Sequence, residues 1–201
     1  MGALLSNLRN TIIVSVVLAV IMLAFGYSLA GSGHQFGQAF LRWTHVVAGI
    51  MWIGLLWYFN FVQIPNMPRI PDEQKPAIGK VIAPAALFWF RWGAAFTVLT
   101  GLLVAGANGY LVQVLTLGAV DGFAVPGHIF IGIGMWLAII MAYNVWFIIW
   151  PNQKIALGMV EAEADAKPKA ARTAMLFSRT NTLLSLPMLV AMAGYQTLVG
   201  S

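Results

Sequence analysis

Two of the three histidines stand in the same short pattern, in which a glycine follows four residues later. His45 is followed by Gly49, and His128 is followed by Gly132. Residues i and i+4 lie on one face of a helix, so each glycine would leave a flat space beside the imidazole ring. Imidazole nitrogens are axial ligands of haem iron. We therefore predict that His45 and His128 clamp one non-covalently bound haem b, with the two glycines giving the porphyrin room.

Other uses of these histidines compete with haem. Histidines inside a membrane also form hydrogen bonds between neighbouring helices without any cofactor. A zinc or copper site is the less favoured alternative, because it needs three or four ligands and the sequence aligns only two histidines. Trp52 is expected to line the haem pocket. His34, which precedes the second apolar run, is expected to be solvated.

Arg91 lies seven residues beyond Pro84, within an apolar run. At 1.5 Å per residue this is about 10 Å into a membrane. None of the apolar runs contains Asp or Glu, and arginine does not lose its charge. Its guanidinium is expected to reach lipid phosphates, to bind backbone carbonyls, or to contact a ligand. Such a ligand would be a haem propionate, a quinone or an anionic substrate.

The composition limits the classes of protein to which this chain can belong. The chain has 201 residues, of which 60% are hydrophobic and 8% charged, and its mean hydropathy is +0.83. A soluble domain carries about 25% charged residues. A soluble globular enzyme, a disordered chain and a nucleic-acid-binding domain are therefore excluded. The absence of cysteine excludes disulfides, thiolate metal sites, iron–sulfur clusters and covalently attached haem.

Five apolar runs are long enough to span a membrane, which takes about 20 residues. They cover residues 11–30, 40–64, 84–107, 126–150 and 182–199. The first run is longer than the apolar part of a signal peptide, so an anchor helix is expected. The shorter run 111–120 is expected to lie at the lipid surface or to re-enter the membrane. The sequence therefore predicts an all-α, polytopic membrane bundle that forms one domain over residues 1–201.

Lysine and arginine gather in two connections, which predicts the orientation of the chain. The connection between the second and third runs is basic, and so is the one between the fourth and fifth. Their basic residues are Arg69, Lys75, Lys80, Lys154, Lys167, Lys169 and Arg172, with Arg179 near the fifth run. The N-terminus is therefore expected in the cytoplasm of a bacterium, with the bundle in the inner membrane. Both histidines then fall in the outer leaflet at similar depth, and residues 161–172 are expected to form a short solvated helix.

Four segments, in this order, resemble the urate oxidase N-terminal, or urate hydroxylase, membrane family. They are LRWTHVVAGIMWIG (41–54), FRWGA (90–94), NVWFIIWPNQK (144–154) and SRTNTLLSLP (178–187). The first segment also resembles membrane proteins of the copper-resistance D type and bacterial membrane protoporphyrinogen oxidases. The resemblance implies a polytopic redox domain in which His45 and His128 match positions suited to haem.

The urate hydroxylase family carries a C-terminal cytochrome c domain, and this sequence departs from it by lacking cysteine. A separate cytochrome c, or another redox partner, is therefore expected. Three functions are expected to compete. The first is a b-type haem protein that transfers electrons within a larger membrane or periplasmic system. The second is a haem-dependent oxidoreductase that acts on urate or a similar small molecule, and the third is a cofactor-free structural subunit of a membrane complex. The lipid bilayer is a partner in all three, and nucleic acid in none.

Overall fold

The computed structural model describes residues 2–30, 35–163 and 165–199. Over these residues the chain is helical and contains no strand. Five helical stretches are long and apolar enough to cross a membrane. They are Leu8–Leu29, Phe36–Arg69, Lys75–Ala107, Pro126–Ala156 and Ala166–Val199. The predicted all-α fold with five spanning segments is confirmed.

The chain divides into two compact units, Met1–Thr44 and His45–Ser201, where the sequence predicted one domain. The first unit contains the short helix α1 (Gly2–Leu5), the spanning helix α2 (Leu8–Ala30) and the beginning of α3 (Gln35–Trp57). Most of the α2 residues are apolar, and they are distributed around the whole helix. A helix that is apolar on every side is suited to contact with lipid.

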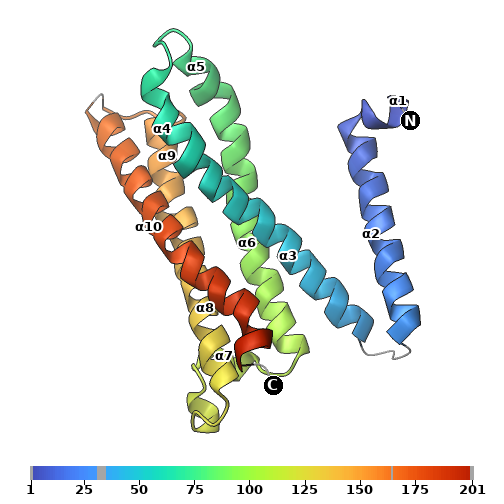
Figure 1. The fold of residues 1–201 in the computed structure, drawn as a ribbon. Coiled ribbons are helices and arrows are strands. Elements are labelled where there is room, and N and C mark those ends of the chain that lie inside the picture. The colour runs from blue at the N-terminus through green and yellow to red at the C-terminus, as the bar shows by residue number, and fades with distance from the viewer. Residues whose placement is uncertain (1, 31–34, 164, 200–201) are drawn as a thin grey trace. The chain divides into compact units, whose positions relative to one another are not determined.

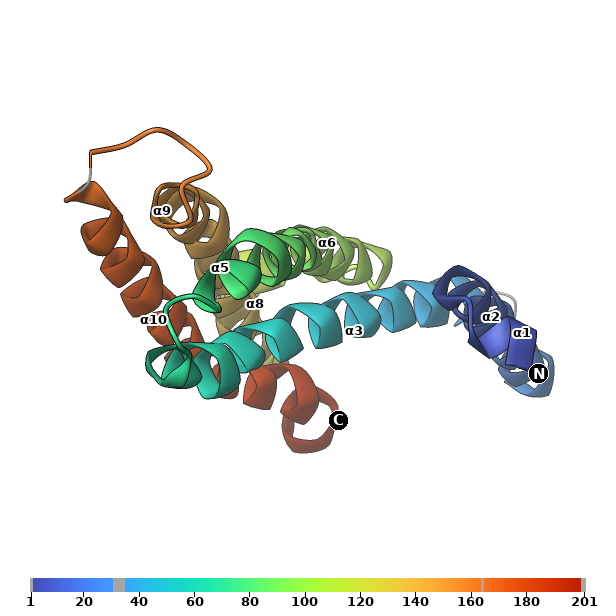
Figure 2. The same ribbon diagram turned by 90° about the horizontal axis from the view of Figure 1, so that it is seen from above.

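The second unit is a bundle of four long helical stretches (Figure 1). The first continues α3 through η1 (Tyr58–Gln63), α4 (Ile64–Asn66) and η2 (Met67–Arg69). The second joins α5 (Lys75–Ala77) and η3 (Ile78–Ile82) to α6 (Ala83–Ala107). The third is α8 (Pro126–Tyr143) with η5 (Asn144–Ile149) and α9 (Trp150–Ala156), and the fourth is α10 (Ala166–Gly194) with η6 (Tyr195–Val199). In Figures 1 and 2, α8 packs between α6 and α10.

Three of these stretches contain a π-helical turn that ends two residues before a proline. The turns η1, η3 and η5 precede Pro65, Pro84 and Pro151. A proline has no backbone N–H, and its ring clashes with the carbonyl four residues earlier. In each case that carbonyl belongs to the π-helical turn. We infer that the wider turn accommodates the proline, so that the helix continues through the membrane without a break.

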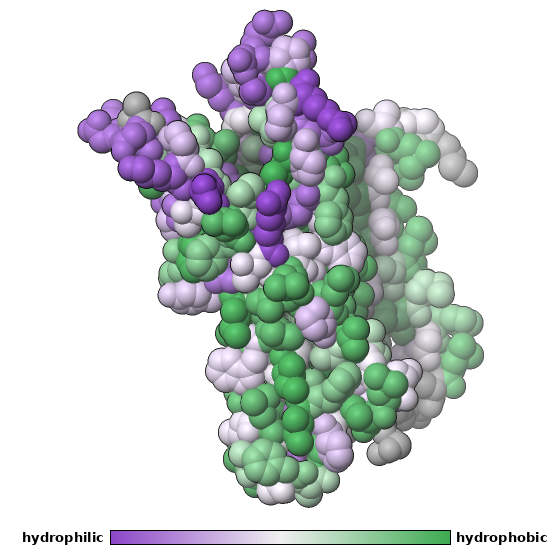
Figure 3. All heavy atoms as spheres, turned by 60° about the vertical axis from the view of Figure 1, so that its left-hand side comes forward, coloured by the Kyte–Doolittle hydropathy of each residue, from purple (hydrophilic) through white to green (hydrophobic). Residues whose placement is uncertain are grey.

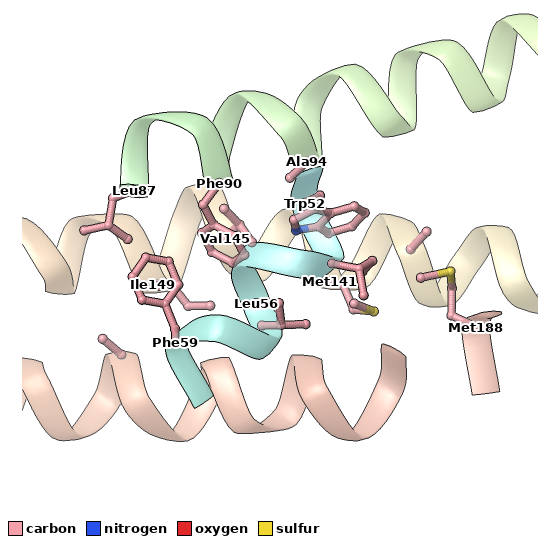
Figure 4. Close-up of a cluster of buried hydrophobic side chains, with 13 residues drawn as sticks. Trp52, Leu56, Phe59, Leu87, Phe90, Ala94, Met141, Val145, Ile149 and Met188 are labelled. Atoms are coloured by element: carbon pink, nitrogen blue, oxygen red, sulfur yellow. The ribbon is translucent and has the colours of Figure 1, made fainter. Parts of the chain in front are cut away.

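The core of the bundle is built from large apolar side chains (Figure 4). Trp52 and Leu56 come from α3 and are fully buried. Phe59 of η1 meets Phe90 of α6 edge to face, with ring centroids 5.7 Å apart. Met141 projects from α8 into the same cluster. The cluster fixes α3, α6 and α8 relative to one another and thereby positions the side chains considered below.

Both basic connections lie at one end of the second unit (Figure 1). Hydrophilic residues gather at that end, over α4, α5 and the connection from α9 to α10 (Figure 3). There Lys75 lies 2.6 Å from Asp72, and its hydrogen bond and positive charge lower the pKa of the Asp72 carboxyl. This distribution of charge is the one that the positive-inside rule requires. Which side of the membrane this end faces stays a prediction.

The charged segment 161–172 is not a separate helix. Its second half, from Ala166, forms the first turns of α10, which runs unbroken to Gly194. Pro168 lies in the first turn, where the missing N–H costs the helix nothing. The expectation of a short solvated helix is therefore wrong, because nothing between residues 169 and 182 breaks helical structure. The last spanning helix therefore begins sixteen residues before residue 182, which adds about 24 Å toward the basic end at 1.5 Å per residue.

Candidate functional site

His45 is held by α6 through one ring nitrogen. Its Nδ1 lies 3.0 Å from the carbonyl oxygen of Thr97 and 3.2 Å from Oγ1 of Thr100. A carbonyl oxygen can only accept, so Nδ1 carries the hydrogen and donates it. In the neutral ring Nε2 then has a free lone pair. Among the described residues Nε2 has no hydrogen-bond partner, so His45 presents a ligand nitrogen.

The room beside the His45 ring comes from a glycine on the neighbouring helix. A Cβ added to Gly101 of α6 would lie 3.0 Å from Cε1 of His45. Gly49, the glycine predicted for this purpose, instead faces Thr97, whose Cγ2 lies 3.9 Å from an added Cβ. The prediction that the i+4 glycine makes the flat space is wrong, because the ring turns toward α6 and away from its own helix.

A cavity of about 40 Å³ lies beside His45. It is lined by residues of α3, α6, α8 and α10, and its wall is almost entirely apolar. The residues of its wall that carry nitrogen, oxygen or sulfur in their side chains are His45, Thr97, Met135, Met188 and Met192. Neither His128 nor Trp52 belongs to the wall. Trp52 is buried in the core, and its Nε1 has no hydrogen-bond partner in the described part of the chain.

His128 is held through the same ring nitrogen by a carboxylate. Its Nδ1 lies 2.6 Å from Oδ2 of Asp121, which belongs to the short helix η4 (Ala119–Asp121). The ring of Tyr110 lies beside it, with centroids 6.1 Å apart. This partner lies outside the five apolar runs, none of which contains an acid, so it was not predicted from the sequence. The available signal was that Asp121 is the only acidic residue between Glu73 and Glu161.

The connection that carries Asp121 is conformationally strained. Leu117 and Phe123 have φ values of 53° and 62°, which are uncommon for residues with a side chain. Gly118 and Gly122 also have positive φ. The other carboxylate oxygen of Asp121, Oδ1, is buried and lacks a hydrogen-bond partner among the described residues. Strained backbone of this kind persists where the surroundings hold it and often marks a functional site.

The structure does not bring His45 and His128 together. Met135 and Ile139 of α8 share the cavity of His45, and they follow His128 by seven and eleven residues. That separation is about 10 to 16 Å along the helix at 1.5 Å per residue. The expectation of equal depth is therefore wrong, and one haem cannot be clamped between these two rings.

Gly132 serves helix packing and gives no room to a cofactor. The short helix α7 (Leu111–Leu115) folds back onto α8 at this position. A Cβ added to Gly132 would lie 2.5 Å from the carbonyl oxygen of Val114. The prediction that Gly132 faces a porphyrin is wrong, because the backbone of α7 fills that space. The apolar run 111–120 thus forms a short helix and turns that cover α8 without spanning the membrane.

Arg91 is held by aromatic rings. Its Cζ lies 3.4 Å from the ring centroid of Trp150 and 5.8 Å from that of Trp146. The indole N–H of Trp146 also donates to the carbonyl oxygen of Arg91 at 3.1 Å. A cation over the face of a tryptophan ring is stabilised by the electrons of the ring. This arrangement supplies a partner that the sequence analysis did not consider. His34, by contrast, lies outside the described residues.

A double-mutant cycle tests the contact of Arg91 with Trp150. Arg91→Met, Trp150→Leu and the double variant are expected to give a coupling energy of about 1–2 kcal/mol, because the cation is partly withdrawn from water. The measurement is the free energy of unfolding in mixed detergent micelles. Lys154 offers a matched control, since its Nζ lies 5.7 Å from the same ring, and its coupling should be smaller. Coupling near zero for Arg91 would contradict the assignment.

The urate oxidase N-terminal family model matches residues 104–197. This stretch includes His128, Asp121 and the two later segments that carried the resemblance, 144–154 and 178–187. It does not include His45 or Arg91. No curated protein and no solved structure matches the chain. The resemblance to the urate oxidase N-terminal family, predicted from the sequence, is therefore confirmed over residues 104–197.

Proposed function

We propose that this multi-pass membrane protein is an electron-transfer domain related to urate oxidase, and that His128 ligates a b-type haem. The observation that carries the proposal is the bond of 2.6 Å between His128 Nδ1 and Asp121. Histidines that bind metals almost always donate their other ring N–H to a carboxylate or a carbonyl. The carboxylate fixes the ring and makes Nε2 a better donor to iron.

The position of His128 suits a haem better than the position of His45 does. A porphyrin is far larger than the cavity of about 40 Å³ beside His45. The side chains of His128 and Asp121 are 15% and 24% exposed, so this pair is accessible from the surface of the bundle. A haem bound there would supply one-electron chemistry, and the chain would set its ligation and surroundings. A second axial ligand is not assigned to this chain.

We also expect a redox partner to bind at one end of the second unit. His128 follows Pro126 at the start of α8, at the end of the second unit opposite the basic connections (Figure 1). We expect a cytochrome c or another redox protein to exchange electrons at that end. Oxidation of urate or a similar molecule at Arg91 is the weaker alternative, because the guanidinium already lies against Trp150.

Visible absorbance of the purified full chain, expressed with ample haem, tests the proposal. The wild type is expected to show a sharp Soret band and an α-band on reduction. His128→Ala should lose both bands, and Asp121→Asn should weaken haem binding about 10- to 100-fold.

His45→Ala is the matched control, since it removes the other intramembrane histidine with a bound Nδ1, and it should keep the bands. A wild type without a Soret band, or a His128→Ala variant with the wild-type spectrum, would overturn the proposal.

A further inference from the structure

The cavity beside His45 is lined by methionines, whose thioether sulfurs are soft metal ligands. Three methionines line it together with the histidine, and they come from two further helices. Met135 belongs to α8, and Met188 and Met192 belong to α10, four residues apart and so on one face. Met188 reaches from α10 toward α8 in Figure 4. Met135 and Met188 are 9% and 4% exposed, so both thioethers are withdrawn from solvent.

We propose that this cavity binds a single Cu(I) ion through Nε2 of His45 and the thioether sulfurs of Met135, Met188 and Met192. Thioether sulfur selects soft cations such as Cu(I), and imidazole also suits copper. No carboxylate or cysteine lines the cavity, so the harder divalent cations find no anionic partner there. All four ligands are neutral. A monovalent ion is the cation that such a set can hold at the lowest cost of desolvation in a membrane.

The size of the cavity points to an ion without further ligands. A volume of about 40 Å³ is enough for one ion or for very few water molecules. It does not accommodate a porphyrin or an organic substrate. The wall is otherwise aliphatic, and water would find few partners there. A bare soft cation therefore fits both the volume and the chemistry of this wall.

The ring of His45 is held by a hydrogen bond from its second nitrogen, as the rings of metal-binding histidines are. Its Nδ1 donates to the carbonyl oxygen of Thr97, which leaves the lone pair on Nε2. Gly101 lets the ring lie close to α6, since an added Cβ would be 3.0 Å from Cε1. The site is independent of His128 and does not rest on the proposed haem. An experiment that contradicts copper binding would therefore leave the haem proposal untouched, and the reverse also holds.

The competing explanation is that the methionines only fill an irregular gap between helices, as methionine often does. Substitutions that conserve volume separate the two explanations. Met188→Leu keeps the size and apolar character of the side chain and removes the sulfur. Met141→Leu is the matched control, because Met141 is fully buried in the neighbouring core and does not line the cavity.

The experiment loads the purified full chain with Cu(I) under anaerobic, reducing conditions against a colorimetric Cu(I) chelator. The wild type is expected to retain one Cu(I) per chain, with nitrogen and sulfur scattering in X-ray absorption spectra. His45→Ala and Met188→Leu should each weaken retention at least tenfold, while Met141→Leu and His128→Ala should retain copper as the wild type does.

Circular dichroism in the same detergent confirms that each variant is folded. Absence of stoichiometric copper from the folded wild type would overturn the proposal. Folded His45→Ala and Met188→Leu variants that retain copper as tightly as the wild type would also overturn it.

Discussion

Gly132→Ala is expected to lower the free energy of unfolding by about 3 kcal/mol, which is the upper part of the usual range for overpacking. The new Cβ would lie 2.5 Å from the carbonyl oxygen of Val114 and 3.0 Å from Cδ2 of Leu117. A side chain can change its rotamer, but the carbonyl belongs to the backbone of α7. The whole of α7 must therefore move away from α8. Equilibrium unfolding in mixed detergent micelles, followed by circular dichroism, measures the loss.

The same substitution should disturb the pair of His128 and Asp121. Val114 and Leu117 lead directly into the strained connection that carries Asp121, so a displaced α7 pulls that carboxylate from its ring. Gly54→Ala is the matched control, because an added Cβ there meets nothing within 4 Å. That variant should be neutral or more stable by up to about 1 kcal/mol, as alanine is the better helix former. Equal stability of the two variants would contradict the packing described for α7.

The number and order of the spanning helices could be predicted from the sequence, because 20-residue apolar runs have few alternatives in a membrane. The ends of the helices could not. Apolar runs mark the part of a helix that lies in lipid, whereas α10 begins at Ala166, well before residue 182. The polar first turns of α10 are helical because they pack against α9. The π-helical turns before Pro65 and Pro151 likewise let helices continue where proline was expected to end them.

The sequence singled out His45 and His128 as candidate ligands, but the residues that surround them depend on three-dimensional packing. The spacing of a histidine and a glycine four residues later identifies only residues that lie beside the histidine on its own helix. The residues that orient His45 and His128 are Thr97 and Asp121, and neither spacing contains them. The methionines of the His45 cavity were missed for a related reason. Methionine is a common core residue, and only the meeting of α8 and α10 distinguishes these three from the rest.

A stripe of small polar residues on α10 shows the same dependence on packing. Ser178, Asn181 and Ser185 follow one face of the helix and are almost fully buried. Ser178 accepts a hydrogen bond from Asn60 at 2.7 Å, and Ser185 accepts one from Trp57 at 3.1 Å. The sequence alone does not separate such residues from polar groups that cap helices or contact lipid headgroups. The structure assigns them to a buried network that joins α10 to α3, η1 and η5.

Asn181→Leu is expected to lower the free energy of unfolding by about 2 kcal/mol, since it leaves the buried Nδ2 of Asn144 without its acceptor. Asn181 is fully buried and accepts a hydrogen bond from Nδ2 of Asn144 at 2.8 Å. Its own amide donates to the carbonyl oxygen of Met141 at 2.9 Å. Leucine has a similar volume, so the loss reports the hydrogen bonds more than a cavity. Equilibrium unfolding in mixed micelles measures it.

Asn144→Leu combined with Asn181→Leu separates a hydrogen bond from a steric effect. Once leucine replaces both residues, the buried donor of Asn144 that lacked an acceptor is gone. Part of the lost stability should therefore return. Asn66→Leu is the matched control, because this amide bonds only within its own helical stretch, to the carbonyl oxygen of Val62 and to Arg69. Its effect should stay within about 0.5 kcal/mol. If the losses of the two single variants simply added in the double variant, the two amides would act independently. That result would contradict the hydrogen bond between them.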